Sequence, residues 1–151
     1  MFIIASDHGG LPMKEQILAY LSARGVEFRD LGTDNGDSVD YPDFGEKVAR
    51  AIAKGEADKG ILVCGTGIGM SIVANKFPGV RAALVWDDFT AQMSKEHNNA
   101  NIIVLGGRVQ TPEAACRMVG IWLDTVFEGG RHQQRLDKIT QIEQDLRAGI
   151  L

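Results

Sequence analysis

The sequence has little of several features that mark common protein classes. Its only two cysteines, Cys64 and Cys116, fit neither a CxxC motif nor a zinc-ligand spacing. No apolar run approaches the roughly 18 residues that a membrane-spanning helix needs. The first residues, 1–8, lack the basic region of a signal peptide. These absences predict a reduced, cytoplasmic protein that holds no metal and has no membrane partner.

A strong charge of one sign is also lacking. The formal net charge is −4, which argues against nucleic acid or an anionic membrane as the main partner. A few local arginines could still hold one phosphate. The 151 residues, 44% apolar and 24% charged, have the size and composition of a globular protein with a substantial core. Because the chain shows no repeat, low-complexity segment or linker, we expect residues 1–151 to form a single domain.

Short apolar segments alternate with amphipathic segments along the chain. Five of the apolar segments read as strands: 2–5, 26–29, 60–63, 81–86 and 101–105. Strands of this kind, separated by helices, predict a three-layer α/β/α sandwich around a five-stranded parallel, Rossmann-like sheet. Thr111-Pro112-Glu113 is a typical helix start. The last helix, after Gly130, is mostly polar. It could pack on its own domain or extend to a partner subunit, and we expect the extension.

Residues 61–71 hold the most informative stretch, Ile-Leu-Val-Cys-Gly-Thr-Gly-Ile-Gly-Met-Ser. An apolar strand ends at Cys64, and three glycines in five positions lead into a helix, an arrangement that can cradle an anion on backbone N–H groups. The stretch is not a Walker A loop, because no Lys-Ser/Thr pair follows Gly69. It also departs from GxGxxG at Met70, although Asp87, about 20 residues on, leaves a dinucleotide site possible. A tight turn without a ligand is the other interpretation.

Cys64 has two interpretations of its own. It could be a small core residue, the commoner role of a lone cysteine. Its place at a strand end beside a helix start would instead favour a reactive thiol. In parallel sheets ligands bind where the strands end. The polar residues predicted there are Asp7-His8, Asp40-Tyr41, Cys64 to Gly69, Asp87-Asp88 and Arg108.

His97 falls at the end of a predicted helix, where a histidine complements the helix dipole. That end faces the opposite rim of the sheet, so His97 could act at the strand ends only in the site of a neighbouring subunit. Arg131 and Arg135 lie one helical turn apart and could clamp a phosphate, or could belong to a solvated face. His132 lies between them, and nothing else in the sequence indicates a function for it.

Seven short motifs occur together and in order: Ser6-Asp7-His8-Gly9-Gly10, Asp40-Tyr41-Pro42, Cys64-Gly65-Thr66-Gly67-Ile68-Gly69, Ala74-Asn75-Lys76, His97-Asn98, Gly106-Gly107-Arg108-Val109 and Glu128-Gly129-Gly130-Arg131-His132. As a set they resemble the type B ribose-5-phosphate isomerases, within a wider family that includes allose- and galactose-6-phosphate isomerases. Some relatives carry a glutamate at the position of Met70 and lack the cysteine. This chain has Met70 and Cys64, so it resembles the relatives that carry the cysteine.

The resemblance implies a cofactor-free aldose–ketose isomerase that interconverts ribose 5-phosphate and ribulose 5-phosphate through a cis-enediolate. Cys64 would move the proton, and His97, with Asp7 and Thr66, would assist ring opening. The remaining site residues implied are Gly65, Gly67, Ile68 and Gly69 for the oxyanion, Asn98 and Tyr41 for the sugar, and His8, Arg108, Arg131 and Arg135 for the phosphate. The resemblance also implies a homodimer or a dimer of dimers with shared active sites.

Other functions stay open on the sequence alone. The substrate could be allose 6-phosphate, galactose 6-phosphate or a tetrose phosphate, which would need only small changes around Asp40 and Tyr41. The same fold could serve a non-catalytic sugar-phosphate or nucleotide sensor. A redox or dinucleotide-binding protein is a further alternative.

Overall fold

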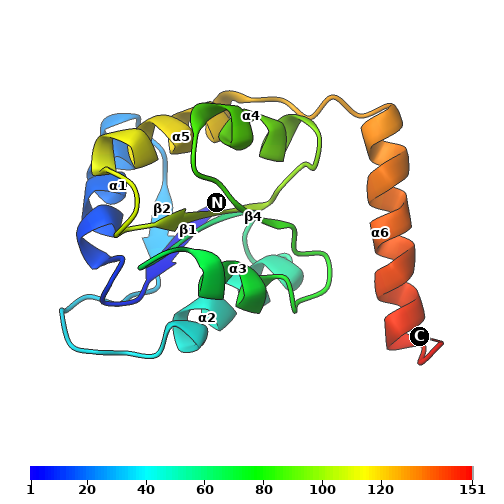
Figure 1. Ribbon diagram of the computed structural model, residues 1–151, viewed down its shortest axis with the longest axis horizontal. Helices are drawn as coiled ribbons and strands as arrows, with labels where there is room; N and C mark the ends of the chain where they lie inside the picture. Colours follow the sequence, from blue (N-terminus) through cyan, green and yellow to red (C-terminus); the bar gives the residue numbers. More distant parts are fainter. Residues whose placement is uncertain (151) are drawn as a thin grey trace.

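The computed structural model describes residues 1–150 and is built on one parallel sheet (Figure 1). The strands lie in the order β2-β1-β3-β5-β4, and every neighbouring pair is parallel. Their bounds are β1 Phe2–Ser6, β2 Phe28–Asp30, β3 Lys59–Cys64, β4 Ala82–Leu84 and β5 Ile102–Gly106. The predicted five-stranded parallel sheet is confirmed.

Two strands are shorter than the sequence predicts, and hydrogen bonds explain both differences. The Val26 N–H donates to the Leu21 carbonyl and still belongs to the end of a helix, so β2 begins only at Phe28. At the other end of the sheet, the Trp86 N–H donates to the Thr90 hydroxyl. This contact starts the next turn, so β4 cannot continue to Trp86.

Helices cover both faces of the sheet (Figure 1). Their bounds are α1 Leu11–Ala23, α2 Tyr41–Ala53, α3 Ile68–Ala74, α4 Asp88–Glu96, α5 Pro112–Asp124 and α6 Arg131–Arg147. The α5 start is the predicted one, since the Thr111 hydroxyl accepts from the Ala114 N–H and Pro112 opens the first turn. Helix α2 begins at Tyr41, directly after the polar loop, and so places that residue beside the strand ends.

Alternation along the central strands divides the interior into two cores. Leu62 and Cys64 of β3 belong to the core under α2 and α3, whereas Ile61 and Val63 belong to the core under α1, α4 and α5. All four side chains are buried, as expected for a central parallel strand. The Cys64 side chain therefore lies on the α2–α3 side of the sheet, near Met70.

Helix α6 stands away from the rest of the chain (Figure 1). Among its residues only His132 and Leu136 are buried, and Ile139, Ile142 and Leu146 are exposed. One carboxylate, that of Glu143, accepts the N–H of Gly79 in the exposed turn between α3 and β4. No helix within residues 1–150 is long and apolar enough to cross a membrane.

Candidate active site

The glycine loop joins the end of β3 to the start of α3. Gly67 has the left-handed angle φ 81°. A Cβ there would lie 2.5 Å from Leu84 Cδ1 and 3.1 Å from the Leu105 carbonyl oxygen. Only glycine fits both the backbone angle and the space. The turn directs the Gly67 N–H at Cys64 Sγ, 3.2 Å away.

The loop after β1 brings a carboxylate and an imidazole to the same edge of the sheet. Asp7 is buried and its Oδ1 accepts the Gly10 N–H at 2.9 Å. His8 Nδ1 accepts the Val39 N–H at 3.2 Å, from the polar loop before α2. In the neutral ring this bond leaves the proton on Nε2, which is free to donate.

The loop after β5 closes the site from the other side. The Gly107 N–H donates to the Cys64 carbonyl at 2.8 Å, and the Arg108 N–H donates to the Gly65 carbonyl at 2.9 Å. The Arg108 guanidinium lies 3.2 Å from where a Cβ of Gly9 would be, and 3.5 Å from where one of Gly65 would be. It thus lies between the two loops.

Tyr41 covers the glycine loop from α2. A Cβ on Gly69 would lie 2.6 Å from its ring, so a side chain at residue 69 would displace the tyrosine. We call the assembled group the cysteine site. Its members, drawn from four separate segments, are Asp7, His8, Tyr41, Cys64 to Gly69 and Arg108.

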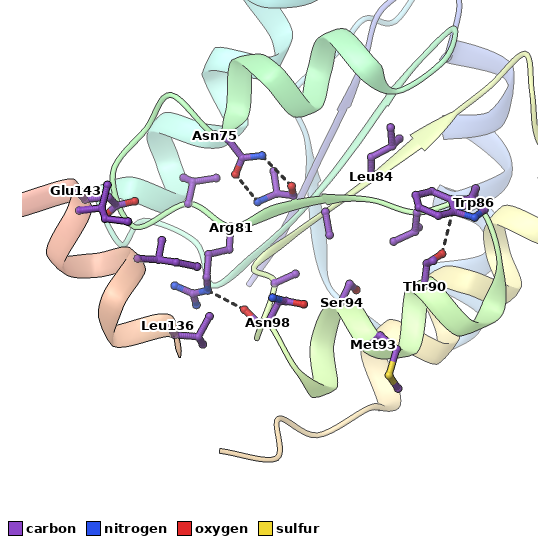
Figure 2. Close-up of a pocket in the computed structure, with 17 residues that line it drawn as sticks. Asn75, Arg81, Leu84, Trp86, Thr90, Met93, Ser94, Asn98, Leu136 and Glu143 are labelled. Atoms are coloured by element: carbon purple, nitrogen blue, oxygen red, sulfur yellow. Dashed lines mark hydrogen bonds between the residues drawn. The ribbon is translucent and has the colours of Figure 1, made fainter. Parts of the chain in front are cut away.

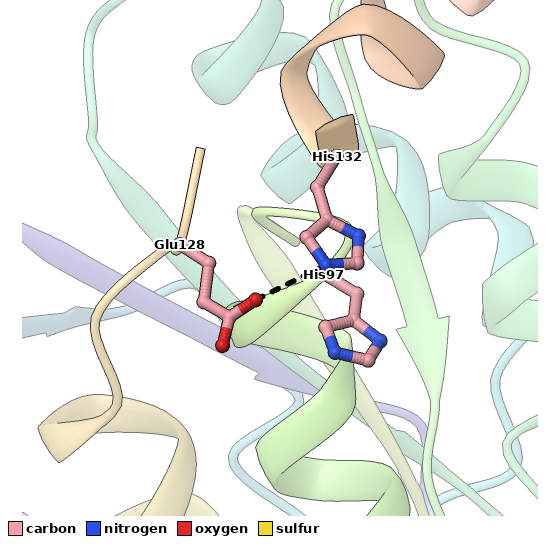
Figure 3. A group of neighbouring side chains, drawn as sticks. All are labelled: His97, Glu128 and His132. Atoms are coloured by element: carbon pink, nitrogen blue, oxygen red, sulfur yellow. Dashed lines mark ion pairs between the residues drawn. The ribbon is translucent and has the colours of Figure 1, made fainter. Parts of the chain in front are cut away.

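The other predicted site residues gather around the end of α4. His97 caps that helix, and its ring stacks on the ring of His132, with centroids 4.1 Å apart and planes 10° from parallel. Glu128 Oε2 lies 3.1 Å from His132 Nε2 (Figure 3). Arg131 and Arg135 project from the same end of α6 and form no ion pair within residues 1–150. We call this group, with Asn98, the histidine site.

The turn after His97 is held by a half-buried arginine that the sequence did not single out. Arg81 donates to the carbonyls of Asn98 and Asn99, both at 3.1 Å. Burial lowers the pKa of the Arg81 guanidinium, and burial likewise lowers the pKa of nearby Lys95, which donates to Asn99 Oδ1. These contacts fix the position of Asn98 relative to β4.

The two sites lie at opposite edges of the sheet. Helix α4 runs back from the carboxyl end of β4, so that His97 comes just before β5 begins, whereas Cys64 stands where β3 ends. Strand β3 has six residues and spans roughly 17 Å at about 3.3 Å per residue. One chain therefore does not bring His97, Asn98, Arg131 or Arg135 to Cys64.

His97, Glu128 and His132 offer donor atoms within 4.8 Å of one another, the spacing of a metal site. The stacking argues against that use. An imidazole binds a metal in its own plane, and two nearly parallel planes stacked face to face do not meet at one ion. At least one ring would have to turn away from the other.

Sequence reasoning gave no role to His132 or Glu128. The one available signal was their spacing, because residues four apart meet at a helix start. Here the acid precedes the helix, and two glycines with positive φ, Gly129 at 68° and Gly130 at 54°, form the turn between them.

The fold and the cysteine site define a class of protein. A doubly wound parallel sheet with a polar cluster outside the carboxyl ends of its strands is typical of α/β proteins that bind small ligands there. The model of the ribose/galactose isomerase family matches residues 2–139, and the chain belongs to this family.

Relatives of known name agree with this assignment. Ribose-5-phosphate isomerase B of Escherichia coli is 49% identical over 138 residues, which cover 91% of this chain and 93% of that protein. D-erythrulose-4-phosphate isomerase of Pectobacterium atrosepticum is 43% identical, covering 93% of each chain. The solved structure of Clostridium thermocellum ribose-5-phosphate isomerase B is 52% identical, covers 97% of this chain and 99% of that chain, and superposes with a TM-score of 0.94.

Proposed function

We propose that the protein is an aldose–ketose isomerase that interconverts ribose 5-phosphate and ribulose 5-phosphate through a cis-enediolate. The observation that carries the proposal is Cys64 at the strand end with the Gly67 N–H directed at its sulfur. A backbone donor at that position stabilises a thiolate. The relatives named as ribose-5-phosphate isomerases support the same substrate.

Isomerisation requires a base at the carbon next to a carbonyl, together with donors where the enolate oxygen forms. We assign the base to Cys64 and the donors to the N–H groups of the loop from Gly65 to Gly69. The thiolate removes the proton from C2 of the open-chain aldose, and the electron pair moves to O1. A proton then passes from O2 to O1, and return of the C2 proton from Cys64 to C1 leaves the C2 carbonyl of the ketose. The residues of the loop need no metal or organic cofactor for this step.

The phosphate is assigned to four basic side chains. His8 and Arg108 belong to the cysteine site, and the His8 Nε2 proton is free for an oxyanion. Arg131 and Arg135 belong to the histidine site and are exposed on the first turns of α6. A phosphate held by both pairs would hold the sugar between the two sites and orient C1 and C2 at Cys64.

Such a site needs two copies of the chain, and the surface offers a place for the second copy. An apolar groove of about 580 Å³ runs between β4, α4 and α6 (Figure 2). Leu136, Ile139 and Ile142 of α6 line its outer wall. On α3, beside the glycine loop, Ile68 and Ile72 are more than half exposed.

We assign these two isoleucines to the groove of the partner in a two-fold dimer. The same contact would bring each Cys64 toward the partner's histidine site, where His97 would assist ring opening together with Asp7 and Thr66. Two such dimers could assemble further. Action on a soluble sugar phosphate fits the cytoplasmic location that the sequence predicts.

The test is isomerisation itself, followed by NMR in D2O. We expect ribose 5-phosphate to convert to ribulose 5-phosphate with deuterium entering C1 of the ketose. The Cys64→Ala variant should lose about 10²- to 10⁴-fold in kcat, the usual contribution of a general base, while still binding the sugar phosphate. Binding of ribose 5-phosphate without turnover by the unaltered protein would leave the sensor interpretation.

A tetrose phosphate is the second candidate substrate, because one relative is named for erythrulose 4-phosphate. Comparing kcat/KM for four-, five- and six-carbon phosphates decides between the candidates, allose and galactose 6-phosphates included. A higher kcat/KM for erythrulose 4-phosphate than for ribose 5-phosphate would overturn the assignment of the pentose.

A further inference from the structure

The His132 side chain is buried in a way that its surroundings do not explain. Only 3% of the residue is exposed, and its Nε2 has no solvent contact. The Glu128 carboxylate lies 3.1 Å from that nitrogen, but the nitrogen makes no hydrogen bond within residues 1–150. Burying an imidazole nitrogen without a hydrogen bond is unfavourable. Another contact of the ring must therefore offset this cost.

That contact is the ring of His97. The His97 side chain is 36% exposed, whereas the His132 side chain is 4% exposed. The two rings stack with nearly parallel planes, and Figure 3 shows them next to one another with Glu128 beside His132. One face of His97 is covered by the His132 ring, and its Nε2 lies 3.8 Å from Glu96 Oε1, beyond hydrogen-bond distance.

A backbone hydrogen bond links the segment that contains Glu128 and His132 to the end of the helix that carries His97. The Glu128 N–H donates to the carbonyl of Glu96 at 3.0 Å, one residue before His97. The His132 N–H donates to the Gly129 carbonyl at 3.0 Å, which closes the turn between the acid and the helix. The segment from Glu128 to His132 therefore moves with the end of α4.

We propose that His132, held by Glu128, is a positioning residue for ring opening. It fixes the ring of His97 by stacking, so that a ring nitrogen meets the anomeric hydroxyl of a sugar bound at the partner's cysteine site. The proposal rests on the isomerase function proposed above. It adds a residue that never touches the sugar and acts only through His97.

The chemistry of the substrates separates this role from a general structural one. Ribose 5-phosphate closes to a furanose through O4, so a base must take the O1 proton while an acid protonates O4 and the C1–O4 bond breaks. Erythrose 4-phosphate carries its phosphate on O4 and cannot close that ring. A defect confined to ring opening therefore slows the pentose phosphate and spares the tetrose phosphate. A defect in proton transfer or phosphate binding slows both.

The experiment measures kcat/KM for ribose 5-phosphate and for erythrose 4-phosphate in three variants. His132→Ala removes the stacked ring, and we expect a loss of about 10- to 100-fold on the pentose with less than about twofold on the tetrose, as for a misplaced reacting group. His132→Phe keeps an aromatic face of similar size and should restore most of the pentose activity. Gln133→Ala, on an exposed neighbour, is the matched control and should alter neither value.

The outcomes are distinct. Equal losses on both sugars in His132→Ala, or no loss on either, would overturn the positioning role. His132→Phe remaining as slow on the pentose as His132→Ala would also overturn it, because stacking would then not be the cause. A protein that isomerises neither sugar before any substitution would instead overturn the proposed function. If His132→Ala fails to fold, as shown by its circular dichroism, His132→Phe and the tetrose comparison carry the test alone.

Discussion

The separation of the cysteine and histidine sites leads to a complementation experiment. Cys64 and His97 lie at opposite edges of a sheet whose central strand spans roughly 17 Å, and a histidine side chain reaches less than half of that. Each proposed active site therefore takes Cys64 from one chain and His97 from another. The variants Cys64→Ala and His97→Asn should each be inactive on ribose 5-phosphate when pure.

Mixing the two variants should restore activity. A mixed pair combines the intact Cys64 of one chain with the intact His97 of the other in one of its two sites, and its second site lacks both residues. Random exchange of equal amounts makes about half of the dimers mixed, so that about one quarter of the original activity returns. The assay refolds the two variants together from denaturant and follows the formation of ribulose 5-phosphate.

A matched control uses two substitutions at the same edge. Cys64→Ala mixed with Arg108→Ala should give no more activity than the mean of the two separate proteins, because every site then contains one defect. Absence of recovery in the Cys64→Ala and His97→Asn mixture, in dimers verified as mixed by two different tags, would refute the shared site.

Two further predictions concern stability. Gly67→Ala should lower the free energy of unfolding by about 1–3 kcal/mol, measured by urea denaturation. Alanine disfavours φ 81°, and its Cβ would approach Leu84 Cδ1 to 2.5 Å. An unchanged urea midpoint would contradict this strain. Asp87 accepts hydrogen bonds from the N–H and the hydroxyl of Thr90, and these bonds lower the pKa of its carboxyl. The contribution of this cap to the stability of the fold is therefore present above the ordinary aspartate pKa and is lost as the pH falls below that range. The difference in Tm between the original protein and Asp87→Ala should therefore shrink in acid, and a constant difference from pH 7 to pH 3 would count against the cap.

The sequence was sufficient for the sheet because its local signals agree with one another. The segments around Ile4, Leu62 and Ile103 are short, apolar and followed by glycine, which leaves few alternatives to buried parallel strands. Strand ends were less certain. Val26 has the side chain of a strand residue, but its N–H is taken by the preceding helix, a contact that apolar periodicity does not report.

The cysteine site was more predictable than the histidine site for a related reason. Residues that follow parallel strands must meet at one edge, so Asp7, Cys64 and Arg108 could be grouped from their order in the chain. The stack of His97 on His132 depends on where α6 leaves the connection after α5. That direction is set by two glycines with positive φ and by one backbone hydrogen bond to Glu96.

The placement of the two sites has a consequence for the protein as a population of molecules. In the proposed assembly a lone chain has every residue of the active site and both of its halves, but cannot bring the two halves together. Turnover per chain would then depend on concentration: it would fall steeply on dilution below the dissociation constant of the dimer and return when the chains meet again. Separated chains would be folded but inactive. The affinity of the contact at the groove beside α6 would therefore set the fraction of chains that are active.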